Sequence, residues 1–265
     1  KLYECCADEQ CDRGFACFDH ECRRPILDPA NKIAFKYNDS LYVMESNGSD
    51  AAKLTSDDLA WYTYYPSWSY DGRKLASGSN SLYFINIDGK NKTIFGSGYD
   101  PIWMPDGRIL YYSGESPYGI VAKNLSTGEA EKLFDIYDVD ELSLSPDGTK
   151  IAYVRTSWGL PIVSWIYFVN LECQSDDYFV FGEQPAWSPD GKKLAFNKNG
   201  IRIFDFETQE NRTLTAGSTP AWSPKGDKIA YTRPEGGNAV INIDGTGQTN
   251  LTSVGSWPSW SPLQT

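Results

Sequence analysis

The sequence repeats one phrase, and this repetition limits the possible folds more than any other feature. "QPAWSPDGKKLAF" occupies positions 184–196, and near-copies read "TPAWSPKGDKIAY" at 219–231, "YPSWSYDGRKLAS" at 65–77 and "DPIWMPDGRILYY" at 100–112. Each copy has an apolar start with a tryptophan, then an Asp-Gly or Lys-Gly dipeptide that favours a tight turn, then a β-rich run. A unit that recurs along a chain predicts a fold built by stacking copies of one small supersecondary structure.

The residues after each phrase complete the repeating unit. A second β-rich run follows, such as "SLYFINI", "WIYFVNL" or "IRIFDF", then a turn, and then a short last run such as "NKTIF" or "NRTLT". Each unit therefore predicts four short strands, which we name a to d from the phrase onward. Their period of about 35 to 45 residues is typical of a β-propeller blade. No segment has a sustained helical period, so few helices are expected.

The phrase occurs six times, which predicts six blades. The copies centre on Trp68, Trp103, Leu144, Trp187, Trp222 and Trp260. The last copy, "WPSWSPLQT", stops after strand a, whereas "NKIAFKY", "SLYVMES" and "AAKLT" before the first copy read as strands b, c and d. We expect the C-terminal strand to pair with these N-terminal strands, because that pairing closes the ring and leaves no open sheet edge.

The phrase "PAWSPDGKKLAF" resembles the repeat of the TolB-like β-propeller family, and the resemblance extends over about residues 31–262. The Gly-His and Trp-Asp signatures of WD repeats are absent. The resemblance implies an all-β fold, a six-bladed propeller of four-stranded blades. We expect two parts, a disulfide-rich head at 1–28 and the propeller at 29–265. Function does not follow from this resemblance, because propellers have many unrelated activities.

Charge and hydropathy narrow the classes of partner. The formal net charge is −11, which argues against nucleic acid and anionic membranes, since both require a basic surface. No apolar run approaches the roughly 20 residues that span a bilayer, so membrane insertion is not expected. No cofactor or metal is expected either.

Five of the six cysteines lie within the first 22 residues, at Cys5, Cys6, Cys11, Cys17 and Cys22. Such clustering in a short segment is typical of disulfides formed in an oxidising compartment. A zinc site is the less favoured alternative, because no C-x2-C knuckle occurs and His20 is the only histidine.

The spacing from Cys6 resembles that of small secreted Dickkopf-type or EB-type cysteine-rich modules. The resemblance implies the pairs Cys6–Cys17 and Cys11–Cys22. Cys5 and Cys173 then remain, and they are expected either to form an internal Cys5–Cys173 bond or to join two chains. Cys173 is expected in a turn between strands c and d, on the face where the head enters the propeller.

Six Asn-X-Ser/Thr sequons also indicate export, as the mature form of a secreted or cell-surface protein. They begin at Asn38, Asn47, Asn91, Asn124, Asn211 and Asn250. They would serve as glycosylation sites in a compartment with the machinery. The alternative is that polar β-turns are simply rich in these residue types.

No catalytic residue is assigned. A Ser-His-Asp triad requires a histidine base, and His20 lies in the cysteine-rich segment; no G-x-S-x-G motif occurs. The acidic run Asp135, Asp138, Asp140 and Glu141 could serve glycoside hydrolysis or bind Ca²⁺, but a solvated loop is the favoured interpretation.

The residues that precede each strand-a core are expected to ring the mouth of the central channel, opposite the head. They are Tyr65, Asp100, Glu141, Gln184, Thr219 and Trp257. Their mixed chemistry suits a ligand site, although a water-filled opening is an equal alternative. The expected function is non-catalytic protein interaction or self-assembly, in the form of a surface or filament subunit. The alternatives are a carbohydrate- or peptide-binding receptor and a glycan-acting enzyme that uses channel carboxylates.

Overall fold

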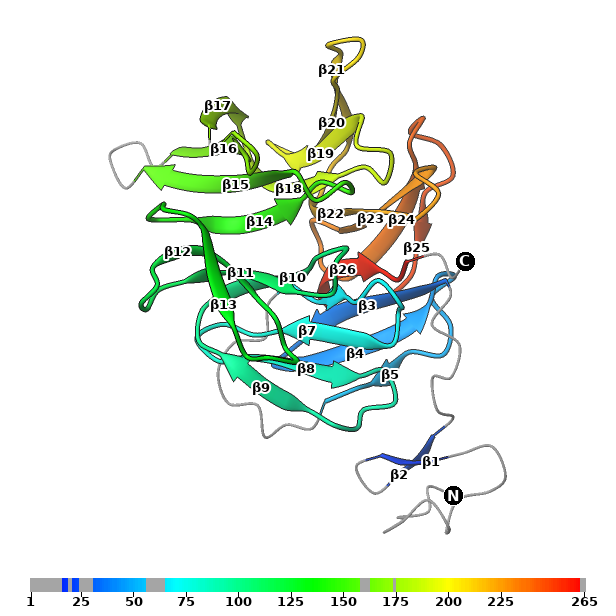
Figure 1. Ribbon diagram of the computed structural model, residues 1–265. Coiled ribbons are helices and arrows are strands. Elements are labelled where there is room, and N and C mark those ends of the chain that lie inside the picture. The colour runs from blue at the N-terminus through cyan, green and yellow to red at the C-terminus, as the bar shows by residue number, and fades with distance from the viewer. Residues whose placement is uncertain are drawn as a thin grey trace.

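A computed structural model describes residues 16–18, 21–23, 31–55, 65–157, 163–173 and 175–262. Six four-stranded antiparallel sheets form the blades of a propeller (Figure 1). The first strand of each blade contacts the first strand of the next, from β6 around to β26 and back to β6. The predicted all-β, six-bladed fold is confirmed. None of the described residues forms a helix long and apolar enough to cross a membrane.

The blades are numbered along the chain, and blade 1 is the one that joins the two ends. Blade 1 contains β26 (Ser256–Trp260), β3 (Lys32–Tyr37), β4 (Ser40–Glu45) and β5 (Ala52–Lys53). Blade 2 contains β6 (Ser67–Trp68), β7 (Lys74–Ser77), β8 (Leu82–Asn86) and β9 (Thr93–Gly96). Blade 3 contains β10 (Tyr99–Trp103), β11 (Ile109–Ser113), β12 (Gly119–Lys123) and β13 (Ala130–Phe134).

The other three blades repeat this order of strands. Blade 4 contains β14 (Asp140–Leu144), β15 (Lys150–Ser157), β16 (Val163–Asn170) and β17 (Ser175–Phe181). Blade 5 contains β18 (Glu183–Trp187), β19 (Lys193–Asn197), β20 (Ile201–Asp205) and β21 (Asn211–Thr215). Blade 6 contains β22 (Ser218–Trp222), β23 (Lys228–Thr232), β24 (Asn238–Asn242) and β25 (Thr249–Asn250).

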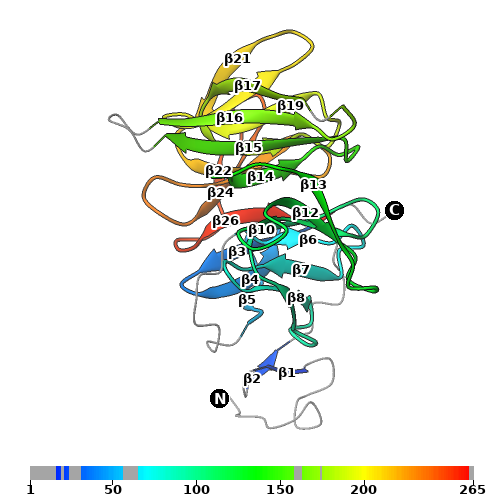
Figure 2. The ribbon, with the colours of Figure 1, turned by 60° about the vertical axis from the view of Figure 1, so that its left-hand side comes forward.

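Blade 1 closes the ring as predicted. The C-terminal strand β26 pairs antiparallel with β3, with Trp260 opposite Ile33 and Ser259 opposite Ala34. Figures 1 and 2 both show the red β26 beside the blue β3. The Lys32 N–H donates to Ser261 Oγ at 2.9 Å. Because β26 pairs with β3, the peptide groups on this edge of β3 are hydrogen-bonded and not exposed as an open sheet edge.

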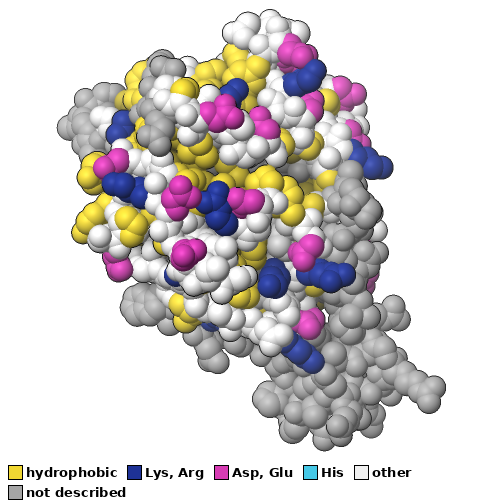
Figure 3. Space-filling model, in the orientation of Figure 1, with side chains coloured by type: hydrophobic (Ala, Val, Ile, Leu, Met, Phe, Trp, Pro, Cys, Tyr) yellow, Lys and Arg dark blue, Asp and Glu magenta, His cyan; other side chains and the backbone are white. Residues whose placement is uncertain are grey.

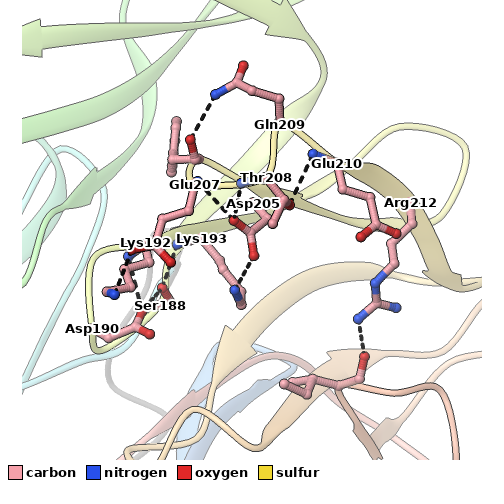
Figure 4. Close-up of polar contacts among 12 residues, drawn as sticks. Ser188, Asp190, Lys192, Lys193, Asp205, Glu207, Thr208, Gln209, Glu210 and Arg212 are labelled. Carbon is pink, nitrogen blue, oxygen red and sulfur yellow. Dashed lines mark hydrogen bonds and ion pairs between the residues drawn. The ribbon is translucent and has the colours of Figure 1, made fainter.

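The Ser-Pro-Asp-Gly part of the repeat builds the turn between strands a and b. In blade 5, Ser188 Oγ donates to Asp190 Oδ1 at 2.6 Å and accepts the Lys193 N–H at 2.8 Å (Figure 4). The same carboxylate accepts the Lys192 N–H. The turn's polar groups are therefore satisfied locally, which explains why these residue types recur.

The turns between strands a and b and between strands c and d lie on the same face of the blade. In Figure 4 the Lys193 ammonium contacts the Asp205 carboxylate, and the Lys192 ammonium lies 2.7 Å from Glu207. These contacts join the a–b turn of blade 5 to its c–d turn.

The tryptophan of the phrase packs each blade against the preceding one. Trp68 Nε1 donates to the Ser259 carbonyl in blade 1 at 3.0 Å, and Trp222 Nε1 donates to the Ala186 carbonyl in blade 5 at 3.0 Å. Both indoles also enter buried apolar clusters between adjacent blades. In blade 4 Leu144 takes this position and packs against the cluster between blades 3 and 4.

The cysteine-rich segment is described only at β1 (Ala16–Phe18) and β2 (Glu21–Arg23), which pair antiparallel with Cys17 opposite Cys22. Cys5, Cys6 and Cys11 lie outside the described residues, so the pairs Cys6–Cys17 and Cys11–Cys22 stay predictions. Cys173 is an exposed free thiol whose sulfur lies 3.1 Å from Ser175 Oγ. Because Cys5 lies outside the described residues, the two expected alternatives, an internal Cys5–Cys173 bond and a bond between two chains, stay predictions.

Candidate functional site

The six residues predicted to ring the channel mouth do lie together. They line one cavity of about 280 Å³ at the start of the six innermost strands. The ring consists of Tyr65, Asp100, Glu141, Gln184, Thr219 and Trp257. We call these six residues the mouth ring. Each blade contributes one residue, so the ring combines carboxyl, amide, hydroxyl and aromatic groups.

Every residue of the mouth ring has a left-handed backbone, with φ between 49° and 57°. This conformation is uncommon for residues other than glycine. In blades 3 to 6 and blade 1 the ring residue lies within a β-bulge between strands a and b, as between Glu183 and Ala186. A bulge redirects one side chain. In the sequence, proline follows five of the six ring residues. A proline disfavours the right-handed helical backbone at the residue before it.

Side chains of the mouth ring bind the backbone of the next blade. Asp100 Oδ2 accepts the Glu141 N–H at 2.7 Å, and Glu141 Oε2 accepts the Gln184 N–H at 2.6 Å. Gln184 Oε1 in turn accepts the Thr219 N–H at 2.8 Å. The ring's polar atoms therefore join blade 3 to blade 4, blade 4 to blade 5 and blade 5 to blade 6.

A residue that the sequence did not reveal completes this series. Thr232 lies at the end of β23, and its Oγ1 is 2.6 Å from Thr219 Oγ1. The same oxygen accepts the Trp257 N–H at 3.1 Å. Thr232 thus joins blade 6 to the closing blade. Its place in an ordinary β-rich run gave no signal in the sequence.

Tyr65 contacts the adjacent blade 1 and also extends across the opening to blade 4. Its ring centroid lies 4.1 Å from that of Trp257, and its hydroxyl donates to Glu141 Oε1 at 3.1 Å. Tyr65 belongs to the segment that leads into blade 2, Trp257 to blade 1 and Glu141 to blade 4. The mouth is therefore bordered on one side by an aromatic pair and on the other by carboxyl groups.

The carboxyl groups of the mouth ring are poorly solvated. Burial raises the pKa of Asp100 to about 7, against the opposing effect of hydrogen bonds from the Glu141 and Leu142 backbone. Burial likewise raises the pKa of Glu141 to about 7, with Asp100 and Glu183 adding to the shift. Burial and the carboxylates of Glu141 and Asp100 also raise the pKa of the Tyr65 hydroxyl. The charge at this mouth therefore changes near neutral pH.

The acidic run after β13 divides between the mouth ring and its rim. Glu141 belongs to the ring, whereas Asp135, Asp138 and Asp140 are exposed on the loop that leads to it. Across the described ranges, no three His, Cys, Asp or Glu side chains are grouped so that they could hold a metal ion. The favoured interpretation of a solvated loop agrees with the exposure of these three aspartates.

A second cavity, of about 410 Å³, lies at the other end of the strand-a layer. The tryptophans of the phrase and the prolines of the a–b turns line it, among them Trp103, Trp187 and Trp260. The two cavities share lining residues such as Ile102 and Leu144, so they are successive parts of the channel. No site was predicted here, although the recurrent Trp-Ser-Pro of the phrase was a signal for it in the sequence.

The chemistry available at the mouth ring is mainly hydrogen-bond acceptance and aromatic contact. The ring contains neither a histidine nor a serine–base pair. Its acceptor oxygens and aromatic rings are groups that can contact a bound ligand.

Comparison with known structures fits this architecture. TolB from Acinetobacter baumannii superposes with a TM-score of 0.76 and 22% identity, over 88% of this chain and 67% of that chain. The fold is that of the TolB-like propellers. Oligogalacturonate lyase from Vibrio parahaemolyticus shares the TolB-like propeller more distantly, with a TM-score of 0.52 and 14% identity over 79% of this chain and 73% of that chain.

Sequence comparison gives one informative relative. An uncharacterized peptidase, YuxL, of Bacillus subtilis (strain 168) is 31% identical over 191 residues, which cover 66% of this chain. This chain spans only 27% of the length of that relative. No family profile matches the sequence.

Proposed function

We propose that this protein is a non-catalytic propeller that binds a partner protein at the channel mouth. The observation that carries the proposal is the use of the ring's polar atoms. Asp100, Glu141 and Gln184 each accept a backbone N–H of the next blade, so these groups hold the rim in place. A rigid rim reduces the entropy that binding must overcome.

The aromatic pair and the desolvated carboxyls support a binding role at this mouth. Tyr65 and Trp257 provide a large apolar contact area with few rotatable bonds, the type of side chain enriched in binding hot spots. The cavity of about 280 Å³ accommodates one or a few side chains of a partner rather than a whole element. The likeness to TolB is consistent with an interaction role.

Peptide selection tests the proposal. Random peptides displayed on phage are selected on the immobilised protein, and the winners are synthesised and titrated by calorimetry. A photo-crosslinking amino acid, p-benzoylphenylalanine, is placed at position 257 in one variant and at position 70 in another. Position 70 is the matched control, because Tyr70 is 50% exposed and lines the opposite end of the channel.

We expect saturable one-to-one binding and crosslinking at position 257 but not at position 70. The failure of every selected peptide to saturate would contradict the proposal, as would crosslinking confined to position 70. Both variants are first compared with the parent protein by thermal unfolding, so that only folded proteins are interpreted.

A second candidate is a glycan-acting enzyme that uses the channel carboxyls. Asp100 and Glu141 favour it, because a carboxyl group whose pKa is near 7 can serve as a general acid. Oligogalacturonate is one glycan to test, because an oligogalacturonate lyase has a similar fold. Release of unsaturated or reducing ends from oligogalacturonate, lost in Glu141→Gln, would establish an enzyme and displace the first proposal.

We also propose that the protein is exported, is glycosylated at its sequons and associates with copies of itself. Five of the sequon asparagines are exposed and Asn124 is half-buried, so all six lie at the surface. Sedimentation of the purified protein over a range of concentrations tests self-association. A single monomer mass throughout would contradict that part of the proposal.

A further inference from the structure

The loop between β13 and β14, together with the first residue of β14, exposes three polar or aromatic side chains and buries two apolar ones. Ile136 and Val139 are 2% and 3% exposed and pack in the cluster between blades 3 and 4. Between and after them, Tyr137 is 59% exposed, and Asp138 and Asp140 are exposed. Because two buried side chains lie within this short segment, its backbone is anchored to the core between blades 3 and 4.

Two more exposed tyrosines lie next to this loop. Tyr118 is 51% exposed and immediately precedes Gly119, where an added Cβ would lie 2.4 Å from the Phe134 carbonyl oxygen. The turn that carries Tyr118 therefore touches the start of the loop. Tyr99 is 37% exposed.

Tyr112 links Tyr99 to the loop. The Tyr99 ring centroid lies 6.3 Å from that of Tyr112, and the Tyr112 hydroxyl is close enough to Asp138 for the backbone and the carboxylate of Asp138 to act on its pKa. We call Tyr99, Tyr118, Tyr137, Asp138 and Asp140 the tyrosine–carboxylate surface. It lies beside the mouth ring, because Asp140 directly precedes Glu141.

Negative charge on this surface has no positive counterpart in the described part of the chain. No ion pair joins Asp138 or Asp140 to a lysine or arginine there. The nearby cations are engaged: Lys132 lies 2.9 Å from Asp135, and the Arg155 guanidinium stands over the Tyr167 ring at 5.5 Å.

The charges of the two aspartates act on their neighbours and on each other. Burial and the charge of Asp138 raise the pKa of Asp140, and both carboxylates help to raise the pKa of Tyr112. A cation would relieve this repulsion. The face visible in Figure 3 has acidic and basic side chains interspersed.

We propose that the tyrosine–carboxylate surface docks an extended, arginine- and lysine-bearing segment of the partner protein. This inference rests on the proposed function and names the chemistry of the partner. The two aspartates pair with the cations, and the exposed tyrosine rings accept cation–π contacts, for which arginine is best suited. A net charge of −11 also speeds the encounter with a basic partner.

The experiment measures fluorescence anisotropy of a labelled peptide of alternating arginine and glycine. A peptide in which citrulline replaces arginine keeps the shape of the side chain and removes its charge. The test protein is Asp138→Asn with Asp140→Asn. The matched control is Glu172→Gln with Glu210→Gln, which removes two exposed charges on the opposite face. Both double variants therefore have the same net charge.

We expect the Asp138→Asn, Asp140→Asn protein to bind the arginine peptide about fivefold more weakly than the parent, and the control to stay within about twofold. Tyr137→Leu keeps the apolar area and loses the cation–π contact, so we expect binding to weaken by roughly two- to fivefold. Asparagine accepts the left-handed backbone of position 138, where φ is 56°, so folding is preserved.

Equal losses in both double variants would overturn the inference, because they would show binding to net charge alone. Equal affinity for the citrulline peptide would overturn it as well. Phage-selected peptides that bind the protein but lack cations and ignore the Asp138→Asn, Asp140→Asn change would overturn this inference and leave the proposed function standing. The absence of any saturable peptide would instead contradict the proposed function.

Discussion

The mouth ring shows how single residues hold a propeller's centre together. Asp100 and Glu141 each pair a desolvated carboxyl with a peptide N–H of the next blade. Burial favours the neutral carboxyl and the peptide hydrogen bond favours the charged one, and burial has the larger effect. Ring stability should therefore depend on pH.

Glu141→Gln tests this dependence. The pKa of Glu141 is raised from 4.5 to about 7, so the folded state holds the proton more tightly than the unfolded state does. The free energy of unfolding therefore falls as pH rises from about 4.5 to about 7, because the folded protein must release the Glu141 proton. Above about pH 7 the stabilising contribution of that proton is fully lost. We expect Glu141→Gln to gain about 1–3 kcal/mol relative to the parent between pH 5 and pH 8, measured by denaturant unfolding.

Glu172→Gln provides the control, since Glu172 is exposed in a c–d turn. Both variants remove one acidic group, so the general effect of net charge is matched. A stability difference between parent and Glu141→Gln that stays constant across this pH range would contradict the raised pKa.

Thr232→Val tests the link between blade 6 and blade 1. Valine matches the shape of threonine but leaves the Trp257 N–H without its acceptor and the Thr219 hydroxyl without its partner. We expect a loss of about 1–3 kcal/mol in the free energy of unfolding. Thr249→Val removes an exposed hydroxyl from β25 and should change stability by less than about 0.5 kcal/mol. Equal effects of the two substitutions would show that the Thr232 contacts add nothing.

At the scale of the element, the turn between strands a and b could be predicted almost completely. Ser188 and Asp190 satisfy the turn's N–H groups through contacts that lie within five residues, so their chemistry is visible in the local sequence. The mouth ring was also predictable, since its residues directly precede the core of each strand a.

Long-range contacts were not predictable. The reach of Tyr65 to Glu141 joins residues 76 positions apart, and Thr232 acts from strand b on an N–H in another blade. Such contacts depend on how blades are rotated about the channel, and a pattern of residue types within one repeat does not encode that rotation.

Gly119→Ala tests the contact between the Tyr118 turn and the loop after β13. Gly119 has φ of 113°, and an added Cβ would lie 2.4 Å from the Phe134 carbonyl oxygen. Gly107 also has positive φ, at 85°, but an added Cβ there meets nothing within 4 Å. Gly107→Ala therefore isolates the backbone effect, about 1 kcal/mol.

We expect Gly119→Ala to lose about 2 kcal/mol more than Gly107→Ala in chemical unfolding. The difference arises because the Phe134 backbone must move. Identical losses would mean that the turn and the loop are not in firm contact.

At the scale of the whole molecule, the number of blades and the closure were predictable, because both follow from counting strands. A chain that ends at residue 255 lacks β26 and exposes the edge of β3. It also deprives Trp68 Nε1 of the Ser259 carbonyl. Because a whole strand is lost, we expect aggregation or a fall in melting temperature of about 10 °C or more. A chain ending at residue 262 is the control, and an unchanged melting temperature for the shorter chain would refute closure by β26.

The sequons are a second property of the whole surface. Asn91, Asn211 and Asn250 are exposed at or beside outer strands. Expression in a glycosylating host should add mass at these three positions, as measured by intact-mass spectrometry. Asn91→Gln should remove one glycan. A bare polypeptide mass would contradict the prediction.

The pairing of β26 with β3 also sets an order of events during synthesis. The two strands meet across 229 residues, as the bond from Lys32 to Ser261 shows. While the ribosome makes the intervening blades, β3 waits without its partner, and its free peptide groups can capture strands of other nascent chains. Fast translation of the central blades, or a chaperone that occupies β3, would shorten that exposure. The exposure of this edge of β3 therefore ends only when β26 is free to pair with it.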